Sequence, residues 1–194
     1  MTSIAKHKPI GAGKSSFELI DTAKFFHALN LRKGNVFLDV ACGKGSYALK
    51  AAELVGPQGT VYAIDLWEDG IAGLKTAIEA AELPNVKAIW GDASRHIPID
   101  NQSADVALLA TVLHDFVEDQ TVDGVLQEIV RVTKSDATLA IMEFKKIDGP
   151  PGPPKNIRLT PAEADRLLAA YGFRQERLID VGPYNYLLML RKVS

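Results

Sequence analysis

The stretch Leu38-Asp39-Val40-Ala41-Cys42-Gly43-Lys44-Gly45 decides the fold, because an apolar run ends there in a turn that contains two glycines. The run starts at Val36, and its β-branched and apolar residues are typical of a buried strand. Residues 46–54 follow with helical spacing, and Gly56-Pro57 ends that helix. A strand that leads through glycines into a helix begins a strand–helix–strand unit, whose ligands bind at the carboxyl end of the strand.

The same alternation continues along the rest of the chain. Further strands are predicted at Thr60–Ile64, Val86–Trp90, Asp105–Ala110 and Ala137–Phe144, with helices at Ile71–Ala81 and Val122–Val130. Such units predict a parallel sheet with helices on both faces. Arg174–Val181 and Tyr184–Leu190 are joined by Gly182-Pro183, a turn so short that this pair must be antiparallel. The predicted fold is therefore α/β, a Rossmann-like, doubly wound sheet of seven mostly parallel strands with one antiparallel strand near the C-terminus.

The length of 194 residues predicts a single domain in three parts. Residues 1–34 are expected to form an N-terminal helical cap, with one helix over Phe17–Phe26. Residues 35–144 form the core that carries the predicted ligand site. Residues 145–194 contain a proline-rich connection, a last helix that opens with the capping box Thr160–Glu163, and the C-terminal strand pair.

Composition excludes several classes of function. The chain has 22 basic and 24 acidic residues, a net charge of −2, so no broad nucleic-acid surface is expected. The longest apolar run, Val106–Leu113, is far shorter than the roughly 18 residues of a membrane span. The N-terminus has no apolar stretch typical of a signal peptide, and the single cysteine, Cys42, permits no internal disulfide. A cytoplasmic location is therefore expected.

Carboxylates stand at the ends of three successive predicted strands. Asp39 lies in the first strand, Asp65 ends the second, and Asp92 follows the third. Because the carboxyl ends of parallel strands meet at one edge, these side chains are expected beside the glycine loop. One carboxylate can accept both hydroxyl hydrogens of a ribose, and another can accept from an exocyclic amine. The acidic lining favours a cationic nucleoside ligand, and S-adenosylmethionine has the required sulfonium, ammonium, ribose and adenine groups.

Two other nucleotide-binding patterns were weighed against this one. Gly43–Ala48 also fits the G-x-G-x-x-A pattern of nicotinamide dinucleotide sites. The charge of Asp39 would repel the pyrophosphate of that ligand, so a nicotinamide-dependent oxidoreductase ranks last. Gly11–Ser16 is rejected as a P-loop, because Lys8 stands where that pattern needs glycine and no strand precedes it.

Leu38–Gly45 resembles motif I of the class I S-adenosylmethionine-dependent methyltransferases, L-D-x-G-C-G-x-G. Asp65 resembles the acid of motif II, Gly91–Ala93 the motif on the adenine side, and the strand at Asp105 the motif that opens the substrate side. The likeness covers residues 36–144 closely and is nearest the branch that includes the ubiquinone/menaquinone-biosynthesis methyltransferases. It implies an enzyme that transfers a methyl group to a small-molecule acceptor and releases S-adenosylhomocysteine.

The resemblance also implies a role for each matching position. The cofactor-binding residues expected from it are Asp39, Ala41, Gly43 and Gly45 for the methionine part, Asp65 for the ribose, Leu66 and Trp67 for the adenine ring, Asp92 for the adenine amine with Ala93 beside it, and Ala110 from the fourth strand. Catechol-type relatives hold magnesium with an acid directly after the fourth strand. This chain has Ala110-Thr111 there, so no metal is predicted.

Two positions depart from the family pattern. Ala41 stands where motif I usually has glycine, and its methyl group is expected to be tolerated with a negative φ. The quinone enzymes carry extra helical material between the fifth strand and the last helix, whereas this chain has a short span at 145–159, rich in proline and glycine. The second departure leaves the identity of the acceptor open.

The acceptor side has fewer sequence signals. His114 lies one turn past the fourth strand, where a general base could take a proton from an oxygen, nitrogen or sulfur nucleophile. The alternative is that His114 caps or packs the following helix. Glu143 is a second candidate, with Lys145 or Lys146 as an anchor for an acidic acceptor, and Tyr184–Tyr186 form a further polar group.

These residues predict a methyltransferase that works by in-line displacement, in which the pocket supplies proximity, alignment and exclusion of water. A non-catalytic module that binds S-adenosylmethionine is the alternative, because the acceptor side has a weaker signature. The expected partner is a small-molecule methyl acceptor, and a homodimer is left open.

Overall fold

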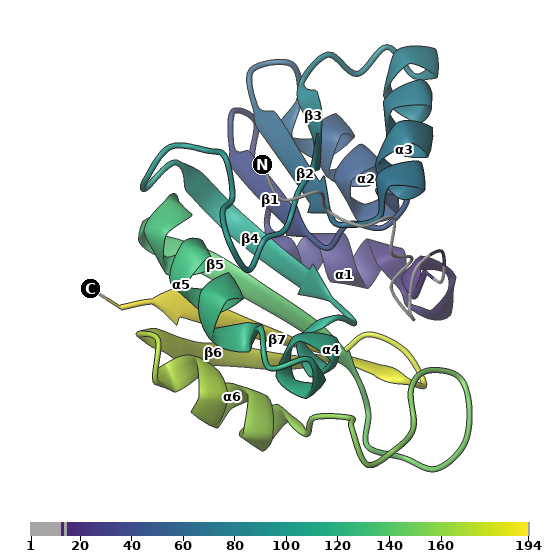
Figure 1. Ribbon diagram of the computed structural model, residues 1–194, viewed down its shortest axis with the longest axis vertical. Helices are drawn as coiled ribbons and strands as arrows, with labels where there is room; N and C mark the ends of the chain where they lie inside the picture. Colours follow the sequence, from purple (N-terminus) through teal and green to yellow (C-terminus); the bar gives the residue numbers. More distant parts are fainter. Residues whose placement is uncertain (1–12, 14, 194) are drawn as a thin grey trace.

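Seven strands form one mixed sheet in the order β3-β2-β1-β4-β5-β7-β6 (Figure 1). The computed structural model describes residue 13 and residues 15–193. The strands are β1 Val36–Val40, β2 Thr60–Asp65, β3 Val86–Trp90, β4 Ala104–Ala110, β5 Thr133–Phe144, β6 Phe173–Asp180 and β7 Asn185–Lys192. Parallel pairing joins β1 to β2 and β4, β2 to β3, and β4 to β5, whereas β7 runs antiparallel to β5 and β6. The predicted fold class is confirmed.

Helices cover both faces of this sheet (Figure 1). They are η1 Phe17–Leu19, α1 Thr22–Leu29, α2 Ser46–Val55, α3 Glu68–Ala80, α4 Leu113–Glu118, α5 Val122–Val132 and α6 Pro161–Ala169. Phe25 of α1, Tyr47 of α2 and Ile71 of α3 belong to the hydrophobic cluster on one face. Leu126 of α5 and Leu168 of α6 belong to the cluster on the other face. In the part of the chain that the structure describes, no helix has the length and apolar character of a membrane span.

The N-terminal cap differs from the single helix predicted over Phe17–Phe26, and that prediction is wrong. A short 3₁₀ helix ends at Leu19, and Ile20 is extended with φ −122° and ψ 160°. Asp21 then caps α1, because its side chain accepts a hydrogen bond of 2.9 Å from the backbone N–H of Lys24. The cap therefore bends at residues 20–21. Residues 1–12 and 14, which include half of the rejected P-loop pattern, lie outside the described residues.

The strand order locates the ligand site. β1 has β2 on one side and β4 on the other, so the chain winds outward from β1 in both directions. In such sheets the crevice forms at the carboxyl ends of the strands where the winding reverses. The loop that follows β1 and the residues that follow β4 meet at this point.

Candidate functional site

A pocket lies at the carboxyl ends of β1 and β4. Its lining consists of Gly13, Ser15, Ser16, Asp39, Ala41, Cys42, Gly43, Lys44, Ser46, Tyr47, Ala110 and Thr111. Three of the predicted cofactor residues, Asp39, Ala41 and Gly43, thus meet Ala110 across the switch point. The N-terminal cap contributes Ser16, which is buried and bonded through Oγ to the Tyr47 hydroxyl at 3.0 Å and to Thr111 Oγ1 at 3.1 Å.

The loop after β1 is a tight reversal that needs left-handed backbone. Gly43 has φ +57° and Gly45 has φ +77°. A Cβ on Gly43 would meet nothing within 4 Å, which leaves room for a ligand. A Cβ on Gly45 would lie 2.4 Å from Leu74 Cδ1, so this glycine, which is not part of the pocket lining, permits α2 to pack against α3. The two glycines therefore serve different purposes.

Ala41 has φ +56°, so the expectation of a negative φ at this position is wrong. The chain must reverse directly after β1, because the Cys42 N–H donates to Ile64 O at 3.1 Å and the Gly45 N–H donates to Cys42 O at 2.8 Å. Thr111, on the opposite wall of the pocket, has φ +55°. A non-glycine residue in this region costs about 1–2 kcal/mol. Strain of this kind concentrates at functional sites, and here both strained residues line one pocket.

Asp39 is the buried carboxyl group that best fits a cationic ligand. Its side chain is buried, and Oδ2 has no hydrogen-bond partner among the residues that the structure describes. Burial, together with the charge of Asp65, raises the pKa of Asp39 to about 8, partly offset by the Ala48 backbone amide. An unpaired buried polar atom costs about 1–3 kcal/mol, which an ammonium group in the pocket would offset. The site thus fits the amino end of the predicted cofactor.

Asp65 holds the loops at the ends of β1 and β2. Its Oδ2 accepts a hydrogen bond of 2.7 Å from the Gly43 N–H, and its Oδ1 accepts one of 2.7 Å from the Trp67 N–H. Burial raises the pKa of Asp65, although these backbone hydrogen bonds oppose the shift. A carboxylate oxygen has two lone pairs, so each oxygen keeps an acceptor position for a hydroxyl group. The predicted ribose residue therefore also shapes the glycine loop.

The residues predicted for adenine lie beyond the pocket, at the ends of β2 and β3. The Trp67 ring packs between two glycines, because a Cβ would lie 2.4 Å from the ring at Gly70 and 3.4 Å from it at Gly13. Leu66, whose carbonyl accepts from Trp90 Nε1 at 3.1 Å, precedes this ring.

Asp92 orders its own turn. Its Oδ1 accepts from the Ser94 N–H at 2.9 Å and from the Ser94 hydroxyl at 2.6 Å, and its Oδ2 lies 3.2 Å from Arg95 Nε. Ala93 is buried beside it. The adenine roles of these residues stay predictions.

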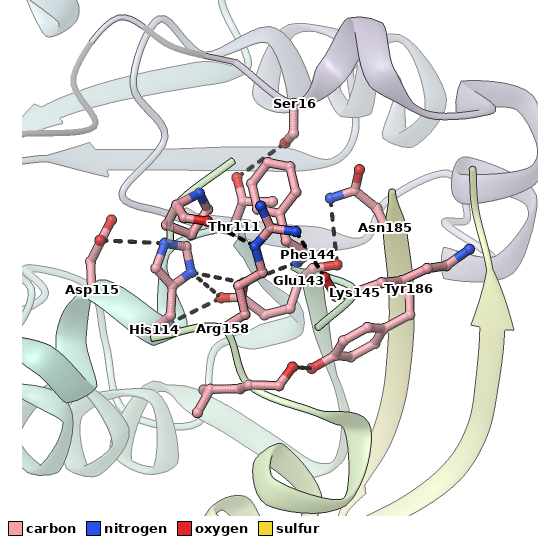
Figure 2. Close-up of polar contacts among 12 residues, drawn as sticks. Ser16, Thr111, His114, Asp115, Glu143, Phe144, Lys145, Arg158, Asn185 and Tyr186 are labelled. Atoms are coloured by element: carbon pink, nitrogen blue, oxygen red, sulfur yellow. Dashed lines mark hydrogen bonds and ion pairs between the residues drawn. The ribbon is translucent and has the colours of Figure 1, made fainter. Parts of the chain in front are cut away.

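Past the end of β4, His114 forms a buried pair with Glu143 (Figure 2). His114 Nδ1 lies 2.8 Å and 3.0 Å from the two Glu143 carboxylate oxygens, and Glu143 is fully buried at the end of β5. The backbone N–H groups of His114 and Phe144 also donate to this carboxylate at 3.2 Å each. The other ring nitrogen, Nε2, lies 3.4 Å from Asp115 Oδ1. In the described residues, no three His, Cys, Asp or Glu side chains form a metal-binding group.

These carboxylates determine the charge of His114. Burial by itself would lower the pKa of His114, but the hydrogen bond and charge of Glu143 and the charge of Asp115 outweigh burial. Arg158 opposes them. The net result is a raised pKa, so His114 binds a proton more tightly than an exposed histidine does.

The proline-rich connection is organised by one buried side chain, Arg158, which is 2% exposed. Its guanidinium group donates to the carbonyls of Pro153, Lys145, Ile147, Gly149 and Pro151 at 2.8–3.1 Å. These five bonds use every guanidinium N–H group. The guanidinium also lies 5.6 Å from the centre of the Phe144 ring. A segment without helix or strand is thus closed around a single cation beside His114 (Figure 2).

Residues 31–168 match the sequence family described as a methyltransferase domain. The chain belongs to this family. The solved structure of a SAM-dependent methyltransferase from Aquifex aeolicus is similar over 100% of both chains, with a TM-score of 0.83 and 29% sequence identity. The predicted resemblance to the class I methyltransferases is confirmed.

Two curated relatives of this methyltransferase domain are named as methyltransferases of quinones. The chain is 35% identical to the demethylmenaquinone methyltransferase of Geobacillus kaustophilus over 115 residues, which are 59% of this chain and 47% of that protein. It is 34% identical to the 2-phytyl-1,4-naphtoquinone methyltransferase of Nostoc punctiforme over 122 residues, 61% of this chain and 50% of that protein. The chain thus spans about half the length of these relatives.

Sequence reasoning missed three features of the methyltransferase domain. Arg158 gave no signal, because the carbonyls that it binds have no sequence signature. Ser16 was read as part of a rejected P-loop, yet it joins the cap to the pocket. The pairing of Glu143 with His114 was missed, although each was named separately, because the two lie 29 residues apart.

Proposed function

We propose that this protein is an S-adenosylmethionine-dependent methyltransferase that acts on a small-molecule acceptor by in-line displacement. The observation that carries the proposal is the buried, unpaired Oδ2 of Asp39 beside the open side of Gly43. Asp39 would hold the ammonium group, and Asp65 would accept from the ribose hydroxyls. Leu66, Trp67, Asp92 and Ala93 would surround the adenine. The bound cofactor supplies an electrophilic methyl group, and the protein supplies alignment and exclusion of water.

On the acceptor side, the proposal gives His114 the role of base and Glu143 the role of orienting it. The Glu143 carboxylate fixes Nδ1, so Nε2 is the nitrogen left to take a proton from an O–H, N–H or S–H nucleophile. For this role Nε2 must exchange its 3.4 Å contact with the half-exposed Asp115 for a contact with the acceptor. Since the pKa of His114 is raised, methyl transfer to an acceptor that must lose a proton should accelerate with pH through that pKa.

The relatives suggest where to begin the search for an acceptor. Both curated relatives are named for acceptors with a naphthoquinone core. A reduced naphthoquinone, 1,4-dihydroxynaphthalene, is therefore the first acceptor to test. The family membership argues against the alternative of a nicotinamide-dependent oxidoreductase.

The test is calorimetric titration with S-adenosylmethionine and S-adenosylhomocysteine, followed by transfer of a labelled methyl group to a panel of small molecules. Asp65→Ala should weaken binding of either ligand by about 1–3 kcal/mol, the cost of a lost buried hydrogen-bonding partner. Asp69→Ala, at an exposed position on α3, is the matched control and should bind as the wild type does. Absence of binding by ligand-free wild-type protein would defeat the proposal. Binding without transfer to any acceptor would favour the non-catalytic module.

A further inference from the structure

We propose that Asn185 forms the far end of the acceptor site, where its side-chain oxygen accepts a hydrogen bond from an O–H or N–H group of the methyl acceptor. This inference rests on the proposed function, because an acceptor is needed only if a methyl group is transferred. It concerns a polar group of the acceptor other than the atom that receives the methyl group.

The orientation of the Asn185 amide is determined by its neighbour. Asn185 is fully buried, and its Nδ2 donates to the Glu143 carbonyl at 3.4 Å. A reversed amide would bring two acceptor oxygens together, so Oδ1 faces away from that carbonyl (Figure 2). Oδ1 has no hydrogen-bond partner anywhere in the described part of the chain. Buried polar atoms are rarely left unpaired, and this one therefore indicates a donor that comes from outside the protein.

The position of Asn185 connects it with the pocket. Because β7 is antiparallel, its first residue lies at the same edge as the end of β5, where Asn185 pairs with Phe144. Strand alternation puts the Asn185 side chain on the face of Leu187, which shares a hydrophobic cluster with Tyr47 of the pocket wall. β5 in turn meets the end of β4, where the Thr111 N–H donates to Met142 O at 2.7 Å. Asn185 and the pocket thus share one edge and one face of the sheet.

The spacing of the strands indicates the size of the acceptor. Neighbouring strands lie ~4.8 Å apart, so Asn185 on β7 is about 10 Å from the end of β4, two strands away. A nucleophile placed at Thr111 cannot itself reach Asn185 over that distance. A compact molecule with a nucleophile at one end and a hydrogen-bond donor at the other can span it. The acceptor is therefore expected to carry two polar groups on opposite sides of a rigid core.

Because Asn185 is fully buried, access to it requires movement of a neighbouring segment, and residues 16–21 of the cap pack against this edge. The cap is held to this edge by the two hydrogen bonds of Ser16 and by a backbone hydrogen bond of 2.8 Å from the Asp21 N–H to Val181 O. Val181 in turn donates its N–H to Asn185 O at 3.4 Å. These bonds can open without breaking the pairing of β5 with β7, so an acceptor can enter while the sheet stays intact.

The test measures binding of two matched probes to protein saturated with S-adenosylhomocysteine, under anaerobic conditions and without turnover. The probes are 1,4-dihydroxynaphthalene, which has two opposed hydroxyl groups, and 1-naphthol, which has one. The wild type should bind the diol at least tenfold more tightly than the mono-alcohol. Asn185→Leu should bind both probes equally weakly and S-adenosylhomocysteine as the wild type does. Asn185→Ala serves the same purpose if the leucine variant does not fold, and Asn101→Leu, exposed on the opposite edge of the sheet, is the matched control.

Each other outcome has a defined meaning. Three outcomes would overturn the role of Asn185: equal binding of the two probes by the wild type, no binding of either probe, or an unchanged preference in Asn185→Leu. In each case, binding of S-adenosylhomocysteine would still support the proposed function. No binding of S-adenosylhomocysteine by the wild type would overturn both. Thermal unfolding of the ligand-free variants checks that they are folded, because Asn185→Leu also removes the Nδ2 donor of the Glu143 carbonyl.

Discussion

The two halves of the carboxyl edge position their polar groups in different ways. Along β1, β2 and β3, short loops present backbone N–H groups, and each carboxylate lies within two residues of the carboxyl end of its strand. Asp65, for example, accepts from the Trp67 N–H two residues away and from the Gly43 N–H in the loop after the neighbouring strand. Along β4, β5 and β7, the contacts join distant segments, since Asn185 meets Glu143 over 42 residues and Ser16 meets Thr111 over 95. Loops at the ends of neighbouring parallel strands therefore build the proposed cofactor half, whereas packing between distant segments builds the proposed acceptor half.

Arg158 offers the strongest test of this difference. Arg158→Met should lower the free energy of unfolding by about 3 kcal/mol, because five carbonyls lose a charged donor, although an opened loop can bond water instead. Urea unfolding measures the loss, and cofactor titration should be unchanged. Arg166→Met, at an exposed position on α6, should change stability by less than about 0.5 kcal/mol. Equal losses in the two variants would show that the acceptor half does not depend on Arg158.

Glu143→Gln tests the buried pair. It should destabilise the protein by about 2 kcal/mol, less than a typical broken buried ion pair, because His114 can give up its proton. The pKa of His114 is raised above its unfolded value of about 6.5. The stabilisation that protonated His114 gives to the folded protein is therefore fully present below that pH. It is lost as pH rises through the folded pKa. The difference between wild type and variant should therefore be largest at low pH.

The measurement for this pair is an NMR titration of the His114 ring together with urea unfolding at several pH values. The His114 pKa should fall in Glu143→Gln and stay unchanged in Glu118→Gln, an exposed position on α4. A His114 pKa that is the same in wild type and Glu143→Gln would contradict the account of the acceptor half.

Asp39 gives a smaller effect on the cofactor half. Since the pKa of Asp39 is about 8, the free protein holds a proton there at lower pH, and an ammonium ligand must displace it. Affinity for S-adenosylhomocysteine should therefore rise about fivefold between pH 7 and 8, as calorimetry can measure. Asp39→Asn should bind more weakly and lose most of this dependence, while Asp69→Asn should retain it. If the affinity of Asp39→Asn changed with pH as strongly as that of the wild type, the pH dependence would belong to another group.

Ala41→Gly should give the smallest effect. Glycine adopts the φ of +56° without strain, although it also gives the unfolded chain a larger conformational entropy. The net effect should be a stabilisation of about 0.5–1 kcal/mol. Ala72→Gly, at an exposed helical position on α3, should instead lower stability by about 1 kcal/mol. Urea unfolding of both variants measures the contrast. A loss of stability in Ala41→Gly would mean that the Ala41 methyl group makes contacts that outweigh the strain.

Sequence reasoning predicted β1 and β3 with their observed bounds, because buried strands flanked by glycine, proline or asparagine have sharp local signals. It began β5 four residues late, at Ala137 instead of Thr133, because the polar residues Lys134, Ser135 and Asp136 interrupt the apolar run. It also missed the bend of the cap at Ile20, where the helical spacing continues although the backbone does not. Local patterns thus located the elements but not the points where tertiary contacts extend or break them.

The sequence by itself determined the fold class, the glycine loop and the carboxylates at the strand ends, because these depend on neighbouring residues and on the regular geometry of parallel strands. The tertiary structure alone decided that Ala41 takes a left-handed backbone, that Glu143 pairs with His114, and that Arg158 closes a loop. It also decided which buried oxygens, Asp39 Oδ2 and Asn185 Oδ1, are left without a partner in the described chain. The physical reason is that a buried polar group is satisfied or left unpaired by whatever the fold brings to it, and that partner can come from any distance along the chain.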